Sequence, residues 1–202
     1  MSAAEILGAA FGLMCVWLTV RQNIWCWPTG LLNNVFFIVL FVQDRLYADL
    51  VLQVFYIFLG LYGWWHWLYG GQARDTLPVT RTPARWATAL ALLGVAATLG
   101  LGLGLREAAR WMNAPPASWL WWDSATTVAC LIAQWMLARK LLENWMVWIA
   151  TNVSYVGLYW TKQRFLLCAL QTVFIALSVK GYRDWRRSLA GAAPQAAGGR
   201  PD

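Results

Sequence analysis

Seven apolar runs, each long enough to cross a bilayer, constrain the fold of this chain more than any other feature. A membrane-spanning helix needs about 20 predominantly apolar residues. Charged residues make up only 12% of the sequence, which is about half the share typical of a soluble domain. We therefore predict an all-α integral membrane protein with seven transmembrane helices. The predicted spans cover residues 3–20, 25–43, 47–68, 86–105, 120–138, 144–162 and 165–182.

The two ends of the chain match each other at a fixed offset of 118 positions, without an insertion. The matched pairs are Trp17 and Trp135, Arg21 and Arg139, Trp27 and Trp145, Asn34 and Asn152, Gln53 and Gln171, Gly63 and Gly181, and Trp67 and Trp185. Chance matching of leucines would not select such uncommon or polar residues. The pattern predicts two parallel three-helix repeats joined by a linker helix, which is a transporter architecture.

This repeat divides the chain into four segments. Residues 1–70 form the first three-helix repeat, and residues 71–118 form a linker loop and the linker helix. Residues 119–187 form the second three-helix repeat. Residues 188–202 are predicted to be a disordered cytoplasmic tail, because they are basic at first and then rich in Ala, Gly and Pro.

Lysine and arginine are distributed unequally between the two sets of connections. The smaller group is Arg45, Arg106, Arg110, Lys162 and Arg164. The larger group is Arg21, Arg74, Arg81, Arg85, Arg139, Lys140, Lys180, Arg183, Arg186, Arg187 and Arg200. Positive charge is enriched on the cytoplasmic side of membrane proteins. We therefore expect a periplasmic N-terminus and a cytoplasmic C-terminus.

Four amide side chains recur inside the predicted spans. Asn34 matches Asn152 on the second helix of each repeat, and Gln53 matches Gln171 on the third. Polar side chains inside a bilayer are costly and usually face a cavity or a partner. For any single residue, a hydrogen bond between helices is an equally good explanation. For the set we prefer a solute site, because the same positions recur in both repeats.

The sixth span places aromatic and amide side chains on one helical face, at spacings of three and four. These side chains are Trp145, Trp148, Asn152, Tyr155 and Tyr159. By depth, Trp148, Asn152 and Tyr155 are expected to line a central site. Trp145 and Trp160 lie near the span ends and are expected in the interfacial aromatic belt. Aromatic faces and amides suit a flat, polar, ring-bearing solute, and aromatic faces also attract cations.

The remaining polar residues favour transport over catalysis. Asp123 could supply a counter-charge or bind a sugar hydroxyl, or it could cap the start of the fifth span, and both explanations stay open. His66 is the only histidine and is expected at a membrane interface, so no His-based metal site, catalytic triad or cofactor is predicted. Membrane topology explains the net charge of +7, so no nucleic-acid partner is expected.

Four segments of the sequence are distinctive: "WPTGLLNN" (27–34), "WDSATTV" (122–128), "AQWMLARKLLENWMVWIATN" (133–152) and "LQTVFIALSVKGYRDW" (170–185). These segments resemble the PnuC family of bacterial nicotinamide riboside transporters. The resemblance implies a 3+1+3 fold akin to SWEET sugar transporters and a homotrimer in the inner membrane. It also implies facilitated diffusion, made one-way by phosphorylation of the vitamin inside the cell. Relatives are thought to carry thiamine, riboflavin analogues or deoxynucleosides, so the solute is less certain than the class.

The resemblance and the residues together predict a solute site between the repeats. Trp148 and Tyr155 could hold the nicotinamide ring. Amide and hydroxyl groups of the solute could bind Asn34, Gln53, Asn152 and Gln171. Trp122 and Asp123 could close the site from the fifth span.

Other function classes account for the sequence less well. A membrane enzyme acting on lipid or quinone needs a base and a nucleophile within reach, which one histidine and few acids do not supply. A structural scaffold explains the glycines but not the paired Asn and Gln residues. A proton-coupled symporter needs a titratable acid in the solute path, and only Glu5, Asp49 and Asp123 lie near spans.

Overall fold

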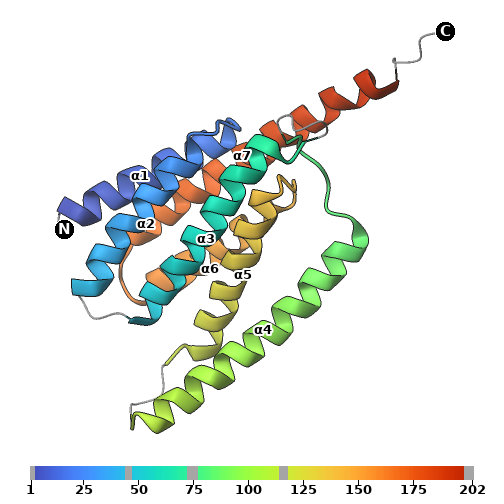
Figure 1. Cartoon of the computed structure of the whole chain (residues 1–202). Coiled ribbons are helices and arrows are strands. Elements are labelled where there is room, and N and C mark those ends of the chain that lie inside the picture. Colours follow the sequence, from blue (N-terminus) through green and yellow to red (C-terminus); the bar gives the residue numbers. More distant parts are fainter. Residues whose placement is uncertain (1–2, 44–46, 72–76, 114–117, 198–202) are drawn as a thin grey trace.

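The computed structural model describes residues 3–43, 47–71, 77–113 and 118–197. These residues form seven helices and no β-strand (Figure 1). The helices are α1 (Ala3–Val20), α2 (Cys26–Gln43), α3 (Tyr47–Tyr69), α4 (Ala84–Trp111), α5 (Leu120–Ala138), α6 (Asn144–Thr161) and α7 (Phe165–Ala197). The predicted all-α class is therefore confirmed.

The apolar runs located five helices to within one residue at either end, and the other two helices are longer than predicted. α4 begins at Ala84 and ends at Trp111, beyond the predicted range 86–105. α7 continues to Ala197, into the segment predicted to be a disordered tail, and residues 198–202 lie outside the described part. Both extensions contain alanine, the best helix former, and a helix can leave the apolar layer without ending.

Within the described residues, three helices are long and apolar enough to cross a membrane by length and composition alone. They are Cys26–Gln43, Ala84–Trp111 and the stretch Phe165–Gly191 of α7. The apolar part of α1, Ile6–Val20, is shorter. α3, α5 and α6 carry many Trp, Tyr, amide and hydroxyl side chains, which lower the mean hydropathy. Even the 18-residue helices span about 27 Å, close to the roughly 30 Å of a bilayer's apolar core.

Six of the seven described helices form a closed ring. α2 packs between α1 and α3, and α6 packs between α5 and α7. Contacts of α3 with α5 and of α1 with α7 complete the ring. α4 lies outside it against α5, as Figure 1 shows. Because α4 packs on one neighbour, most of its long apolar side chains remain exposed on the outer face of the bundle.

Four buried tryptophans fill one end of the ring, and we call Trp27, Trp67, Trp145 and Trp185 the tryptophan cluster. Trp27 meets Trp67 edge to face at 5.4 Å, and Trp145 meets Trp185 edge to face at 5.4 Å. Trp67 and Trp185 contact each other at 5.9 Å between ring centroids. The two edge-to-face pairs are related by the same 118-residue offset seen in the sequence.

Two hydrogen bonds from the tryptophan cluster join the two halves of the ring, which are α1–α3 and α5–α7. The Trp67 indole N–H donates to the backbone carbonyl of Leu137, at 3.1 Å. The Trp185 indole N–H donates to the backbone carbonyl of Thr19, also at 3.1 Å. Thr19 and Leu137 are themselves 118 positions apart. Each half of the ring therefore donates one buried bond to the corresponding helix end of the other half.

The α1–α2 and α5–α6 connections also resemble each other in their cation–π contacts and in their backbone conformation. Arg21 lies over the ring of Trp17 at 4.9 Å, and Arg139 lies over Trp135 at 5.2 Å. The next residue in each connection, Gln22 or Lys140, has a positive φ, 54° and 49° respectively. This left-handed conformation ends both helices in the same way.

Lys140 is the point where these two connections differ in chemistry. Its side chain is only 6% exposed, and its ammonium nitrogen lies 4.4 Å from the centroid of Trp67. Burial lowers the pKa of Lys140 from 10.5 to about 8. The indole face offsets part of the desolvation, because aromatic rings attract cations.

The segment before α4 is fixed to the α5–α6 connection. The backbone of Thr80 pairs with Lys140 and Leu142, at 3.1 and 2.9 Å. The Glu143 carboxylate accepts hydrogen bonds from the backbone N–H and the hydroxyl of Thr82, both at 2.7 Å. Val79 is buried against the tryptophan cluster. The connection leading to α4 therefore packs as part of the bundle end.

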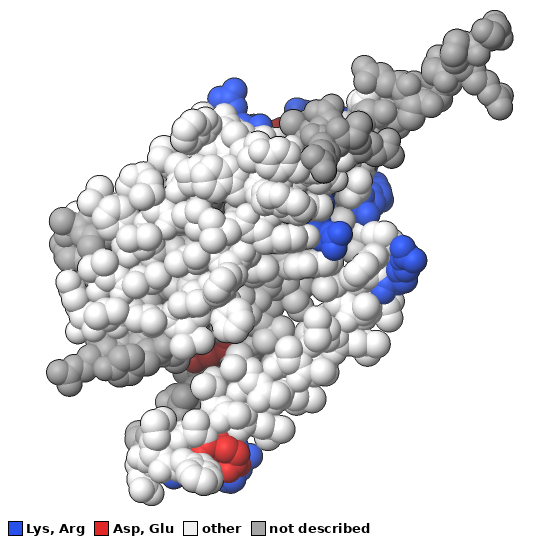
Figure 2. Space-filling model, viewed as in Figure 1, with Lys and Arg blue, Asp and Glu red and all other residues white. Residues whose placement is uncertain are grey.

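Charged side chains lie toward the ends of the bundle. Figure 2 shows Lys and Arg gathered where α7 leaves the ring, with a broad uncharged surface below them. Lys180 and Arg187 both pair with Asp184 near this end, at 2.6 and 3.9 Å. At the far end of α4, Arg110 pairs with Glu107 at 2.5 Å. An uncharged belt between charged ends is what a bilayer requires of a spanning protein.

Candidate functional site

The ring of six helices encloses a central cavity of about 500 Å³. Its lining residues come from α1, α2, α3, α5, α6 and α7. Small-molecule sites in proteins usually measure about 300–1,000 Å³ and are mostly apolar with a few polar groups. The volume is therefore suited to a single small organic solute.

Six of the eight predicted site residues line this cavity. They are Asn34, Gln53, Trp148, Asn152, Tyr155 and Gln171. They come from α2, α3, α6 and α7, so the ring brings together positions that are far apart in the sequence. Their common location follows from the closed ring of six helices, which surrounds one space.

The other two predicted residues lie outside the cavity wall. Trp122 is 41% exposed and contacts Trp119 edge to face at 6.5 Å. Asp123 is also exposed, one turn into α5. Depth along α5 explains the difference, because the residues of this helix that reach the cavity are Cys130, Gln134 and Leu137, two or more turns further on.

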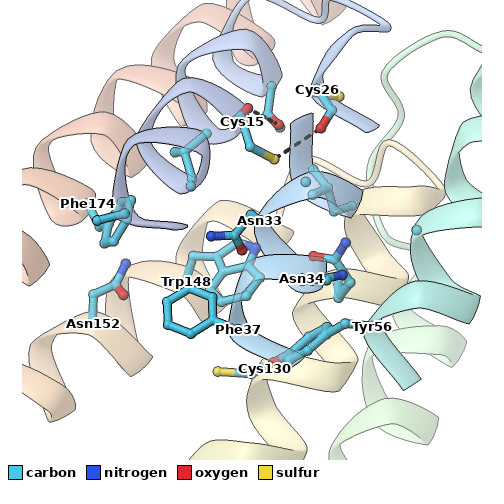
Figure 3. Close-up of a pocket in the computed structure, with 18 of the residues that line it drawn as sticks. Cys15, Cys26, Asn33, Asn34, Phe37, Tyr56, Cys130, Trp148, Asn152 and Phe174 are labelled. Atoms are coloured by element: carbon cyan, nitrogen blue, oxygen red, sulfur yellow. Dashed lines mark hydrogen bonds between the residues drawn. The ribbon is translucent and has the colours of Figure 1, made fainter. Parts of the chain in front are cut away.

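Aromatic and amide side chains alternate around the cavity wall. In the view of Figure 3, Trp148 lies in the middle of the wall, with Asn33 and Asn34 above or beside it and Phe37 and Tyr56 beneath. Asn152 and Phe174 lie on the other side of Trp148 in this view. A solute inside the cavity meets flat apolar faces and amide groups together.

Asn33 and Asn152 differ in what their amides already bind. Asn33 donates to the backbone carbonyl of Gly8 at 2.7 Å and so holds α2 against α1. Asn152 also lines the cavity, and the side-chain hydrogen bonds between described residues do not include its amide. The Asn152 amide is therefore available to a solute, whereas one Asn33 donor is committed to the fold.

Several buried polar atoms in the cavity wall lack a hydrogen-bond partner within the described chain. They include the side-chain oxygens of Gln53 and Gln171 and the indole nitrogens of Trp27 and Trp145. Both pairs are related by the 118-residue offset. An unsatisfied buried polar group costs about 1–3 kcal/mol, so native proteins rarely keep one without a reason. A polar solute bound in the cavity would supply partners for the two glutamine oxygens.

The part of the cavity wall that the structure describes contains no Asp, Glu, Lys, Arg or His side chain. The described residues also contain no cluster of three or more His, Cys, Asp or Glu groups that could hold a metal ion. A cationic solute would therefore be held by aromatic faces and amide oxygens. Of the three acids weighed as proton carriers, Asp49 and Asp123 are not among the lining residues, and the side chain of Glu5 lies outside the described part.

The sequence placed one member of the tryptophan cluster incorrectly. Trp145 was expected in the interfacial belt, but it is 2% exposed and belongs to the cavity wall. Trp67, next to His66, is equally buried. Trp160 is 65% exposed, in keeping with a belt position. Trp145 has a counterpart in the other half and Trp160 has none, but recurrence alone does not indicate burial, because Trp17 recurs as Trp135 and is 44% exposed.

A second cavity, of about 650 Å³, lies between α4 and α5. Its wall is almost entirely small and aliphatic, with Thr82, Thr98 and Glu143 as the polar exceptions. Glu143 already accepts two hydrogen bonds from Thr82. This space lacks the convergent polar groups of a solute site, so the central cavity is the stronger candidate.

Comparison with known proteins links this geometry to membrane transport. The model of the family described as nicotinamide mononucleotide transporter matches residues 2–187. The chain is 26% identical to the nicotinamide riboside transporter PnuC of Escherichia coli (strain K12), over 93% of this chain and 87% of that protein. It is also 26% identical to the riboflavin/roseoflavin transporter RibM of Streptomyces davaonensis, over 90% of this chain and 84% of that protein.

A solved structure has a similar fold. The crystal structure of the vitamin B3 transporter PnuC matches with a TM-score of 0.64 and 20% sequence identity. The match covers 91% of this chain and 80% of that chain. At this level of identity the likeness establishes the fold.

Proposed function

The chain belongs to the nicotinamide mononucleotide transporter family, and from this premise we propose that it carries nicotinamide riboside across a membrane by facilitated diffusion. The family is one of membrane transporters, so the chain is a multi-pass membrane transporter of the nicotinamide riboside type and not an enzyme. The solute, the mode of transport and the binding residues are the parts of this function that we infer.

The observation that carries the proposal is the chemistry of the central cavity. Nicotinamide riboside combines a flat cationic ring, a carboxamide and ribose hydroxyls. The cavity wall offers aromatic faces for the ring, amide groups for the polar substituents, and two glutamine oxygens without partners. A neutral wall of this kind can bind a cation and release it again, which a wall with a fixed carboxylate would oppose.

We assign roles to the six predicted residues that line the cavity. Trp148 and Tyr155 hold the nicotinamide ring by stacking and cation–π attraction, worth about 0.5–2 kcal/mol for each face. The carboxamide and the ribose hydroxyls bind Asn34, Gln53, Asn152 and Gln171. We assign no contact to Trp122 or Asp123, because both side chains lie outside the wall.

Riboflavin is the second candidate solute, because a relative of comparable identity is a riboflavin/roseoflavin transporter. Uptake of labelled nicotinamide riboside into proteoliposomes distinguishes the two. We expect unlabelled nicotinamide riboside to compete at the lowest concentration, and riboflavin, thiamine and deoxynucleosides to compete weakly. Stronger competition by riboflavin would reassign the solute and leave the transporter class intact.

We predict that transport is uncoupled from ion gradients. The described part of the cavity wall has no titratable acid or histidine to carry a proton, and no carboxylate to bind sodium. Proteoliposomes under an imposed proton or sodium gradient should therefore equilibrate labelled nicotinamide riboside at the outside concentration. Accumulation several-fold above that concentration would contradict facilitated diffusion.

We further propose that all seven helices span the inner membrane as two parallel three-helix repeats joined by α4, in a SWEET-like 3+1+3 arrangement. The offset of 118 residues supports this, because it relates residue types, tryptophan contacts and the two indole hydrogen bonds. The family resemblance supports a homotrimer. Light scattering of the purified protein, corrected for detergent, would measure its mass.

The distribution of Lys and Arg supports a periplasmic N-terminus and a cytoplasmic C-terminus. We predict that, in intact spheroplasts, an impermeant thiol reagent labels a cysteine placed at Ser2 and not one placed at Ser188. Inverted membrane vesicles provide the control, since the two sites should exchange their labelling there. Labelling of Ser188→Cys alone in spheroplasts would reverse the topology.

A further inference from the structure

We infer that the tryptophan cluster is the gate that closes the central cavity toward the end carrying Arg21 and Arg139, and that the indole N–H groups of Trp67 and Trp185 are its latch. This inference concerns how the cavity opens, so it goes beyond the solute proposed above. It rests on the position of the cluster, on its hydrogen bonds and on its close packing.

The cluster forms the floor of the cavity. Trp27 and Trp145 belong both to the cavity wall and to the buried core at this end. Trp67 and Trp185 lie behind them and are not among the lining residues. Val79 and Leu142 pack on the same core from the connections outside the ring. A solute leaving the cavity in this direction must therefore separate the four rings.

The latch bonds cross the two contacts that join the halves of the ring. Trp67 is on α3 and its acceptor Leu137 is on α5, whereas Trp185 is on α7 and its acceptor Thr19 is on α1. α3 with α5 and α1 with α7 are the two helix pairs that connect the halves. A movement that parts the halves at both of these contacts breaks both bonds, and a movement at one contact breaks one of them.

Trp27 and Trp145 provide an internal comparison. They sit in the same cluster and are equally buried, but their indole nitrogens have no partner within the described chain. They rest instead against Gly63 and Gly181, where an added Cβ would overlap the rings. Trp27 and Trp145 therefore contribute to the gate by packing alone, whereas Trp67 and Trp185 also form hydrogen bonds between the two halves of the ring.

A native cysteine in the cavity wall can report how readily a reagent reaches the cavity. Cys15 lines the wall, and its thiol donates to the backbone carbonyl of Cys26 at 3.2 Å, as Figure 3 shows. Replacing Cys26, Cys130 and Cys168 by alanine leaves Cys15 as the single thiol and keeps that backbone acceptor. A small, cationic, membrane-impermeant methanethiosulfonate can then be applied from either side of the membrane. A separate Ser188→Cys variant identifies the side on which the cluster lies.

We expect Trp67→Phe and Trp185→Phe each to increase the labelling rate of Cys15 from that side by roughly five- to tenfold, which is the effect of one buried hydrogen bond. The double variant should label roughly 25- to 100-fold faster if the two effects add. Trp27→Phe removes similar volume but no hydrogen bond, so it should increase the labelling rate clearly less than Trp67→Phe or Trp185→Phe. Trp160→Phe serves as the surface control, since Trp160 is exposed.

Two results would overturn the inference. One is an unchanged rate in both Trp67→Phe and Trp185→Phe, and the other is an equal increase in Trp27→Phe, which would point to packing instead of the latch. The single variants and their melting temperatures keep the test decisive if the double variant does not fold. The labelling uses no solute, so its outcome is independent of whether nicotinamide riboside is carried.

Discussion

Gly181→Ala is expected to destabilise the protein by about 1–3 kcal/mol, although alanine is the better helix former. The physical reason is a collision, because a Cβ at Gly181 would lie within 3.0 Å of the Trp145 ring. That ring cannot move away easily, since Trp145 is buried against Trp185 at 5.4 Å. Overpacking of a filled core forces neighbouring side chains and backbone to shift.

The corresponding change in the first half, Gly63→Ala, should have a similar effect, because a Cβ there would overlap the Trp27 ring. Gly157→Ala is the matched control, since nothing lies within 4 Å of a Cβ at that helical position. For a chain of this size, the two core variants should melt about 2–12 °C lower, and Gly157→Ala should not. An unchanged melting temperature in both core variants would refute the close packing of the tryptophan cluster.

The apolar runs predicted the helices well because each span must be long and continuous to cross a bilayer. They could not predict where α7 ends, because Ser188 to Ala197 continue the helix beyond the apolar layer. The packing of the connection before α4 could not be predicted from the sequence either. Its position depends on Thr80 and Thr82 bonding to the α5–α6 connection, and no spacing rule links residues so far apart.

The repeat was the most informative feature for the candidate site. It identified Asn34 with Asn152 and Gln53 with Gln171, and all four line the central cavity. Phe37, Tyr56 and Phe174 were harder to place. The same offset pairs Phe37 with Tyr155 and Tyr56 with Phe174, but these pairs are similar aromatic residues, not identical ones, so a search for identical pairs does not find them.

Depth and composition gave the wrong position for Trp145. An indole near a helix end can face lipid headgroups or pack inside the bundle, and sequence composition favours neither. Trp145 and Trp67 are buried because the halves of the ring meet at that end. Lys140 illustrates the same limit, since a lysine in a connection would be expected in water and is instead buried on Trp67.

Asn152→Leu is expected to weaken the binding of nicotinamide riboside roughly 5- to 150-fold. Leucine has the same branch point as asparagine, is somewhat larger, and lacks the amide. That amide lies in the cavity wall and is not among the groups that hydrogen-bond to another described residue. Its loss should therefore change the stability of the fold little and remove a hydrogen-bond partner of the solute. The loss of a hydrogen bond to a buried polar solute is worth about 1–3 kcal/mol.

Asn33→Leu is the matched control from the same wall. Asn33 donates to the Gly8 carbonyl at 2.7 Å, so its removal should lower the melting temperature. The two variants are therefore expected to separate a binding amide from a packing amide. A lowered melting temperature with unchanged affinity in Asn152→Leu would assign that residue to packing as well.

Calorimetric titration of nicotinamide riboside into purified wild-type protein and Asn152→Leu tests the solute-binding role of the cavity most directly. We predict saturable binding to the wild type, with one solute for each chain, and a dissociation constant raised at least fivefold in a folded Asn152→Leu protein. Absence of saturable binding to the wild type, or equal affinities in the two proteins, would contradict the proposal that this amide-lined cavity holds the solute.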